Sequence, residues 1–270
     1  SSDLLEAIAK KYNVGFLALL QANPGVDPYV PRAGSVLTIP LQTLLPDATR
    51  EGLVLNLAEL RLYYYPPGKN EVTVYPIGIG QLGGDTITPT MVTTVSDKRA
   101  NPTWTPTANI RARYKAMGID LPAVMPAGPD NPMGHHAIRL AAYGGVYLLH
   151  GTNADFGIGM RVSSGCIRLR DDDIKALYNE ISPGTRVTII NTPIKVSVEP
   201  NGTRLVEVHQ PLSKHIDDDP QTLPITLTDS MQAFKQAQLT DTEVMERAMM
   251  LRSGMPVDVT RHPRASEQSL

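Results

Sequence analysis

Proline and glycine interrupt this chain so often that few segments are long enough to form an extended helix. The 270 residues include 23 Pro and 21 Gly but only 3 Phe. Proline removes a backbone donor and glycine favours turns, so the uninterrupted segments between them are short. Such a sequence favours many short strands joined by loops over a helical bundle. We therefore expect a mainly β fold, a β-rich α+β protein.

The composition excludes several classes of protein. The chain is 41% hydrophobic and 19% charged, with a formal net charge of −2, which is typical of a globular protein and not of a disordered one. The near-neutral charge argues against nucleic-acid binding. No apolar run approaches the roughly 20 residues of a membrane span. No signal-peptide pattern opens the sequence, and its first residues already follow a helical pattern, so we expect that a targeting segment has been removed.

Pattern and composition divide the chain into three expected domains. Residues 1–42 predict a small α/β module of two short helices and one strand. Residues 52–192 contain short alternating runs, which predict a β-sandwich or open barrel. Residues 193–270 predict a strand pair, one helix and a disordered tail.

The sequence makes specific predictions for four segments. We expect the two short helices within residues 3–22 and a strand at Gly34–Pro40 that proline ends. The proline-containing segment 97–135 predicts a long loop that acts as a lid or as one wall of a cleft. Residues Asp229 to Met250 predict one continuous helix.

The chain contains one cysteine, Cys166. A single thiol excludes a disulfide scaffold and any zinc site built on several thiolates. It is then either a small hydrophobic group in the core or a reactive nucleophile.

The sequence around Cys166 favours the reactive alternative. His150 follows a buried-looking strand, and Cys166 comes sixteen residues later, directly after Gly165. A glycine before the cysteine permits a sharp turn that exposes the sulfur and the neighbouring backbone N–H groups. A histidine within reach can then form a thiolate–imidazolium pair, while the turn amides receive a developing oxyanion. On an extended segment, Arg168 points to the same side as Cys166 and lowers the pKa of its thiol or binds a substrate carboxylate.

These residues resemble the sequence motif of the YkuD-type L,D-transpeptidases, a His followed after a spacer by Ser-His-Gly-Cys. The matching segments are His150-Gly151-Thr152-Asn153 and Val162-Ser163-Ser164-Gly165-Cys166-Ile167-Arg168-Leu169. The resemblance covers about residues 52–192. With its flanking regions, the chain is similar to the ErfK/YbiS/YcfS/YnhG group over nearly its whole length. Ser164 stands where many members carry a His.

The resemblance implies a role for each motif residue. Cys166 is expected to be the nucleophile and His150 the general base, with the carbonyl of Gly151 orienting the imidazole. The backbone amides of Gly165 and Cys166 would form the oxyanion hole. The side chains expected to position substrate are Arg168, Ser163 and Ser164.

The resemblance also implies a reaction. The thiolate attacks the carbonyl of meso-diaminopimelate in a peptidoglycan tetrapeptide stem, releases D-alanine and leaves a thioester. An amine then resolves the thioester, most often the C-terminal lysine of an outer-membrane lipoprotein. A second diaminopimelate would give a 3→3 cross-link, and water would give L,D-carboxypeptidase activity. Neither a metal nor any other cofactor is implied. Carbapenems are the expected inhibitors, and the periplasm is the expected location.

The first region resembles a LysM module, a family that binds N-acetylglucosamine-containing glycans. The matching residues are Leu4, Ile8-Ala9, Tyr12 and Val14, followed by Asn23-Pro24 and Gly34 to Pro40. The family's first strand is absent from this sequence, so we expect a truncated module. A helical cap without a ligand is the alternative.

Three other functions remain open from the sequence. A zinc hydrolase would use His135, His136, His150 and Cys166, but adjacent histidines on an extended chain point to opposite faces. A sortase-like transpeptidase also uses one Cys, a His and an Arg, with wider spacing between them. A non-catalytic cell-wall-binding protein would use the same scaffold without chemistry.

Overall fold

A computed structural model describes residues 3–81, 87–154, 156–163 and 165–262. These residues form two compact units. One comprises the residues up to Thr49, Asn56–Glu59 and the residues from Ile190 onward, and the other comprises Arg50–Leu55 and Leu60–Ile189. We call them the flanking unit and the central unit and describe each by itself. The expectation of a mainly β fold is confirmed.

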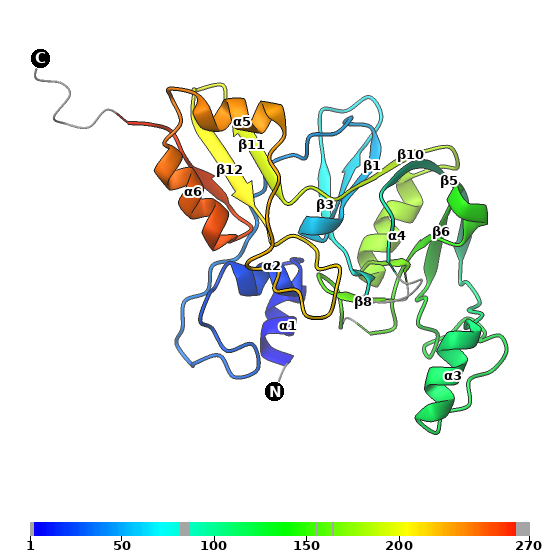
Figure 1. The fold of residues 1–270 in the computed structure, drawn as a ribbon. Coiled ribbons are helices and arrows are strands. Elements are labelled where there is room, and N and C mark those ends of the chain that lie inside the picture. Colours follow the sequence, from blue (N-terminus) through cyan, green and yellow to red (C-terminus); the bar gives the residue numbers. More distant parts are fainter. Residues whose placement is uncertain (1–2, 82–86, 155, 164, 263–270) are drawn as a thin grey trace, which may run out of the picture. The chain divides into compact units, whose positions relative to one another are not determined.

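The central unit is built on one large, mixed sheet (Figure 1). Its eight strands lie in the order β3-β2-β1-β10-β5-β6-β7-β9. Their bounds are Gly52–Asn56 (β1), Arg61–Tyr65 (β2), Thr73–Pro76 (β3), Met91–Ala100 (β5), His136–Leu140 (β6), Leu148–His150 (β7), Ile167–Arg168 (β9) and Arg186–Ile190 (β10). A second, two-stranded sheet pairs β4 (Ile79–Gly80) in parallel with β8 (Arg161–Ser163).

Helix α4 (Asp171–Glu180) packs against β6 and β7. Three aspartates occupy its first turn, where negative charge is favourable. Its other end is held by Lys98 of β5, whose Nζ donates to the carbonyls of Tyr178 at 2.6 Å and Ile181 at 2.7 Å. The helix therefore covers one face of β6 and β7, the strand that ends at His150, and the pocket described below lies on the other face.

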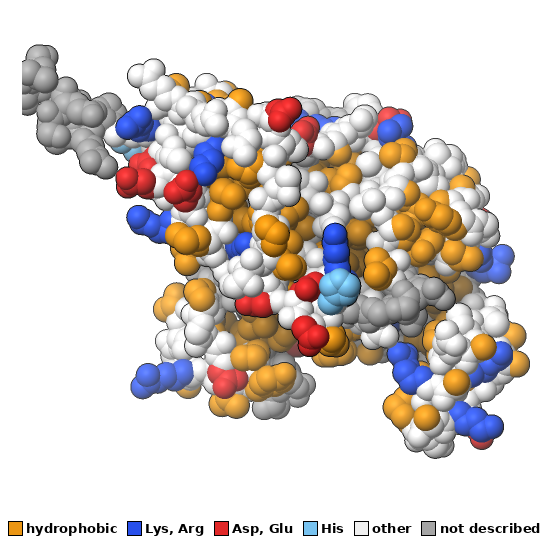
Figure 2. All heavy atoms as spheres, viewed as in Figure 1, with side chains coloured by type: hydrophobic (Ala, Val, Ile, Leu, Met, Phe, Trp, Pro, Cys, Tyr) orange, Lys and Arg blue, Asp and Glu red, His pale blue; other side chains and the backbone are white. Residues whose placement is uncertain are grey.

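Segment 97–135 is more ordered than the predicted loop. Strand β5 runs to Ala100, and helix α3 (Ala108–Ala116) lies within the segment. Thr107 begins α3, because its Oγ1 accepts a hydrogen bond from the Ile110 amide at 3.3 Å. No α3 residue is buried, and basic side chains gather over the helix in Figure 2. The sequence pattern did not predict α3, because an exposed helix lacks the apolar face whose 3.6-residue periodicity would indicate it.

The N-terminal part of the flanking unit contains helices α1 (Asp3–Lys11) and α2 (Phe16–Gln21), as expected. The predicted strand at Gly34–Pro40 is wrong: Gly34 lies in a turn, and none of these residues belongs to a strand. The backbone of this segment is paired by a side chain instead. Asn23 Nδ2 donates to the Thr38 carbonyl at 2.8 Å, and Asn23 Oδ1 accepts from the Thr38 amide at 2.7 Å. The Asn23 side chain thus makes the hydrogen bonds that the backbone of a neighbouring strand would otherwise make.

The C-terminal part of the flanking unit has three strands, one more than expected. They are β11 (Ile194–Val198), β12 (Arg204–Val208) and β13 (Pro256–Asp258), all antiparallel. Two helices, α5 (Asp229–Gln236) and α6 (Thr242–Leu251), replace the predicted continuous helix. The break occurs where the Asp241 side chain caps α6 by accepting from the Val244 amide at 3.1 Å.

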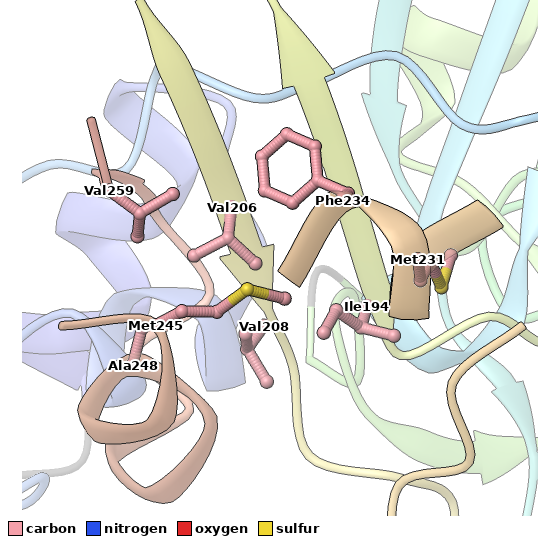
Figure 3. Close-up of a cluster of buried hydrophobic side chains, with 8 residues drawn as sticks. All are labelled: Ile194, Val206, Val208, Met231, Phe234, Met245, Ala248 and Val259. Atoms are coloured by element: carbon pink, nitrogen blue, oxygen red, sulfur yellow. The ribbon is translucent and has the colours of Figure 1, made fainter. Parts of the chain in front are cut away.

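Figure 3 shows the hydrophobic core of this part. Phe234 of α5 and Met245 of α6 lie toward Val206 and Val208 of β12, and Met231 of α5 lies toward Ile194 of β11. Met231 and Met245 therefore pack this core, whereas Met250 of α6 is exposed. None of the helices described is both long enough and apolar enough to cross a membrane.

Candidate active site

Strand register brings His150 and Cys166 to one face of the central sheet. In the parallel pair β7–β9, His150 is opposite Arg168 and Leu149 is opposite Ile167. Cys166 immediately precedes β9, two residues before Arg168. Because side chains alternate along strands, His150, Arg168 and Cys166 share one face, with Cys166 offset by two residues.

That face forms the floor of a pocket of about 440 Å³. His150, Cys166, Arg168 and Ser163 all line it. Segment 97–135 contributes several further lining residues, namely Pro102, Thr103, Trp104, Thr105, Thr107, Ile110, Pro132 and Met133. The four described side chains that the motif singled out therefore meet in one cavity, walled in part by the segment expected to cover it.

His150 is buried and oriented by its own neighbour. Its Nδ1 lies 2.6 Å from the carbonyl oxygen of Gly151, so Nδ1 carries the proton and Nε2 has the free lone pair. The Gly151 amide donates to the His136 carbonyl at 3.0 Å, which fixes the carbonyl's direction. A side chain on Gly151 would collide with the Asp171 carboxylate and with Ile174. Only glycine fits there, since helix α4 begins against it.

Burial controls the charge of the two reactive groups. The pKa of His150 is lowered to about 4, mainly by burial; the Gly151 hydrogen bond opposes this shift, and the Arg168 cation adds to it. Burial also raises the pKa of the Cys166 thiol, although the Leu148 backbone and the cations of Arg139 and Arg168 oppose this. Both directions favour a neutral thiol and a neutral imidazole before substrate binds, in contrast to the thiolate–imidazolium pair expected from the sequence.

The turn that carries Cys166 is held by two hydroxyl groups. Ser163 Oγ donates to the carbonyl of Cys166 at 2.5 Å, and Thr88 Oγ1 donates to the carbonyl of Gly165 at 3.0 Å. Gly165 has a φ of +102°, a conformation that side chains rarely adopt. The Ser163 hydroxyl thus contacts the nucleophile's own backbone. Thr88 carried no signal in the sequence. Ser164 lies outside the described residues.

Arg168 combines a fixed backbone with an incompletely satisfied side chain. Its backbone exchanges two hydrogen bonds of 2.8 Å with Gly78. Its Nε is buried and has no hydrogen-bond partner within the described parts of the chain. A half-buried arginine that lines a pocket is suited to bind an anionic group.

The four residues of the zinc alternative are not assembled. His135 is exposed, and its Nδ1 lies 2.6 Å from Asp171 Oδ2. His136 packs against the Tyr178 ring, with 4.8 Å between centroids. Neither histidine lines the pocket with His150 and Cys166.

Among the described residues, one group has the composition of a metal site: Glu59, Glu207 and His209 of the flanking unit, all buried. The ammonium of Lys195 already lies between the carboxylates, 3.0 Å from Glu207 Oε1 and in contact with Glu59 Oε1. His209 Nε2 lies 2.6 Å from Glu207 Oε1. Both carboxylates of this group therefore already contact the ammonium of Lys195 within the protein.

Comparison with known families identifies each region of the chain. The family model for the L,D-transpeptidase catalytic domain matches residues 50–189. A LysM domain matches residues 1–40, and an L,D-transpeptidase C-terminal domain matches residues 193–259. The resemblances to the YkuD-type enzymes and to LysM are confirmed.

Two relatives of known sequence agree with these matches. The protein named "Probable L,D-transpeptidase YcfS" of Escherichia coli K12 is 84% identical over 266 residues, which are 98% of this chain and 83% of the relative. "Probable L,D-transpeptidase YbiS" of the same organism is 52% identical over 94% of this chain and 82% of its own length. A solved structure of an Enterococcus faecium L,D-transpeptidase mutant is 20% identical and covers 52% of this chain and 49% of its own, with a TM-score of 0.38.

Proposed function

Because the chain belongs to the L,D-transpeptidase family, we propose that it acts on peptidoglycan tetrapeptide stems through a thioester on Cys166. One observation carries the proposal. The β7–β9 register aligns His150 with Arg168 and sets Cys166 on the same face, beside a shared pocket. A nucleophile, a base and a cation for substrate are then provided by two adjacent strands.

In the proposed first step, the Cys166 sulfur attacks the carbonyl of meso-diaminopimelate. His150 Nε2 accepts the thiol proton as the carbon–sulfur bond forms, since its Nδ1–H is occupied by the Gly151 carbonyl. The same proton then passes to the leaving nitrogen, and D-alanine departs with its amine. Because both groups favour their neutral forms beforehand, proton transfer accompanies attack and does not precede it.

The surrounding groups have distinct proposed roles. The amides of Gly165 and Cys166 stabilise the oxyanion, and the positive φ of Gly165 supports this assignment. Arg168 binds a carboxylate of the stem. The Ser163 hydroxyl holds the Cys166 carbonyl and so positions the nucleophile. We retain Ser164 as a substrate-contacting residue on the basis of the motif alone.

An amine completes the reaction by attacking the thioester. The proposed acceptor is the C-terminal lysine of an outer-membrane lipoprotein, while a second diaminopimelate would give a 3→3 cross-link and water would give carboxypeptidase activity. Aminolysis must compete with water, and the pocket walls from segment 97–135 support a role for that segment in excluding solvent. The LysM match supports glycan binding beside the stem. A substrate in the cell wall implies a periplasmic location, and carbapenems are the proposed inhibitors.

The proposal is tested by incubating the protein with tetrapeptide muropeptides and reading the products by mass. Addition of a peptide ending in the lipoprotein's lysine should give a conjugate that has lost one D-alanine. A dimer without added peptide would identify 3→3 cross-linking, and a free tripeptide would identify carboxypeptidase activity. Unchanged substrate under every condition would contradict the proposal and favour the non-catalytic alternative.

A further inference from the structure

A β-bulge in β5 turns one carboxylate into the active-site pocket. Val95 is opposite Leu140 of β6, but Asp97 is opposite Arg139, so Ser96 is an extra residue. Leu140 and Arg139 face opposite sides of the sheet. Val95 and Asp97 therefore also face opposite sides, although residues two apart normally share a face. Without the bulge, Asp97 would point into the core with Val95. With it, Asp97 lines the pocket.

The register across four strands extends this arrangement to the nucleophile. Asp97 is opposite Arg139, and Arg139 is opposite Leu148, which in turn neighbours Cys166. All four residues line the pocket. Adjacent strands are about 4.8 Å apart, so Arg139 begins roughly 10 Å from the Cys166 strand and Asp97 begins one strand further away. The row thus has the sulfur at one end and an opposite-charge pair at the other.

Arg139 is held in place at this distance from the sulfur. Its Nη1 donates to the Gly145 carbonyl at 2.6 Å. A Cβ on Gly145 would come within 2.9 Å of Arg139 Cδ, so the loop closes directly over the arginine. The next residue, Val146, places its carbonyl 3.9 Å from Cys166 Sγ. One short loop therefore contacts both the guanidinium and the nucleophile.

Asp97 keeps most of its capacity to bind a ligand. Its contact with Arg99 is long, 3.8 Å between Oδ2 and Nη2, and both side chains are more than half exposed. Exposed pairs of this kind are weak. The pocket therefore offers an accessible carboxylate beside an oriented guanidinium.

We propose that Asp97 and Arg139 bind the far end of the side chain of the third stem residue. This inference rests on the proposed function. The side chain of meso-diaminopimelate is a short aliphatic chain that ends in a carbon bearing both an ammonium and a carboxylate. With its own carbonyl at Cys166, the residue extends this end along the row. Arg139 receives the carboxylate and Asp97 the ammonium, so the pair selects diaminopimelate over lysine, which has the ammonium alone.

The test compares two tetrapeptides that differ only at the third residue, meso-diaminopimelate or L-lysine. Release of D-alanine is measured for the wild type, Arg139→Gln, Asp97→Asn and Arg247→Gln. Arg247 is an exposed arginine of α6 outside the pocket and serves as the matched control. We expect Arg139→Gln to lower kcat/KM for the diaminopimelate peptide by roughly 10- to 100-fold, the effect of a lost charge-assisted contact, mainly through KM. The lysine peptide should change by less than about twofold, because it lacks the carboxylate.

Asp97→Asn should lower kcat/KM for both peptides, since both carry the ammonium. A peptide whose diaminopimelate has an amidated far carboxyl should react with the wild type as poorly as the ordinary diaminopimelate peptide reacts with Arg139→Gln. Equal losses on both peptides in Arg139→Gln would overturn the inference and assign Arg139 to the nucleophile or to a carboxylate that the peptides share. No loss on either would also overturn it. These outcomes leave the proposed function intact, whereas a wild type that releases D-alanine from neither peptide contradicts both.

Discussion

Two groups of charged side chains in this protein differ in how far the protein itself matches their charges. In the flanking unit, Lys195 contacts Glu59 and Glu207, and His209 contacts Glu207, all of them buried. Lys195 also donates to the Leu44 carbonyl at 2.6 Å, and Glu207 Oε2 accepts from the Leu44 amide at 2.5 Å. Such a closed network fixes local structure, because each charge has its partner.

The pocket of the central unit shows the opposite arrangement. Arg168 has a buried Nε without a partner in the described chain, and Asp97 has only a long contact with Arg99. Strand register fixes where these two residues lie, yet their binding capacity is left for a ligand. Charged side chains whose partners lie within the protein therefore stabilise the fold. Charged side chains that keep unused hydrogen-bonding capacity in the pocket are available to bind substrate.

The largest expected effect is on the nucleophile of the pocket. Cys166→Ser should lower D-alanine release by a factor on the order of 10³ or more, because a serine hydroxyl beside a low-pKa imidazole is a far weaker nucleophile. Steady-state assays of D-alanine release measure this. An unchanged circular-dichroism spectrum is the control, and near-normal turnover would remove Cys166 from the mechanism.

The closed network should respond most strongly in stability. Lys195→Met leaves Glu59 and Glu207 buried without their ammonium, and we expect a loss of about 3–5 kcal/mol in the free energy of unfolding. Denaturant titration measures the change. Lys235→Met is the matched control, since the partly exposed Lys235–Glu246 pair should be worth less than about 1 kcal/mol. Similar losses in both variants would contradict the distinction drawn here.

His150 connects the pocket to the stability of the fold through pH. Its pKa is about 4 in the folded protein and about 6.5 when unfolded, so the unfolded chain binds more protons between these values. Lowering the pH from about 6.5 to about 4 should therefore reduce the free energy of unfolding, by at most about 3 kcal/mol. His150→Gln should remove this part of the pH dependence in denaturant titrations. An identical slope in both proteins would show that His150 titrates normally.

Substitution of Arg168, whose Nε has no partner in the described chain, should affect catalysis more than stability. Arg168→Ala should raise KM or lower kcat. The loss in kcat/KM should correspond to about 1.5–3 kcal/mol, the range of a charge-assisted hydrogen bond. Arg168→Lys should recover part of the loss, because the charge remains while the planar fork does not. Kinetics unchanged by the alanine substitution would exclude Arg168 from substrate binding.

The smallest effect is expected at Ser163. Ser163→Ala removes one hydrogen bond to the Cys166 carbonyl, with an expected cost of about 0.5–1.5 kcal/mol in stability. If the hydroxyl positions the nucleophile, kcat should fall while KM is maintained. A rise in KM alone would instead support direct contact with substrate.

The motif residues could be predicted because they are close in sequence and lie at strand ends. Alternation along an extended segment predicted that Arg168 lies on the side of Cys166, and the motif predicted His150 as its partner. The β7–β9 pairing that brings all three to one face is given by the fold. Asp97 and Arg139 could not be predicted. Their facing depends on the bulge at Ser96, and one inserted residue reverses the alternation that a sequence pattern relies on.

The closed network escaped prediction for a different reason. Its charged members come from three separate segments, around residues 59, 195 and 207–209, and each looks like an ordinary polar residue in its own context. Only the fold brings them together. Strand β13 was missed likewise, since its pairing with Arg204–Val208 is a tertiary contact. The break between α5 and α6 has a local cause that the pattern of apolar residues does not show, the Asp241 cap on the Val244 amide.

The central claim is that Cys166, aligned with His150, carries the acyl group. Intact-mass measurement after exposure to a carbapenem, followed by proteolysis and peptide sequencing, tests it most directly. We expect one stable acyl adduct on the peptide containing Cys166 and no adduct on folded Cys166→Ala. An adduct on any other residue, or no adduct on the folded wild type, would contradict it.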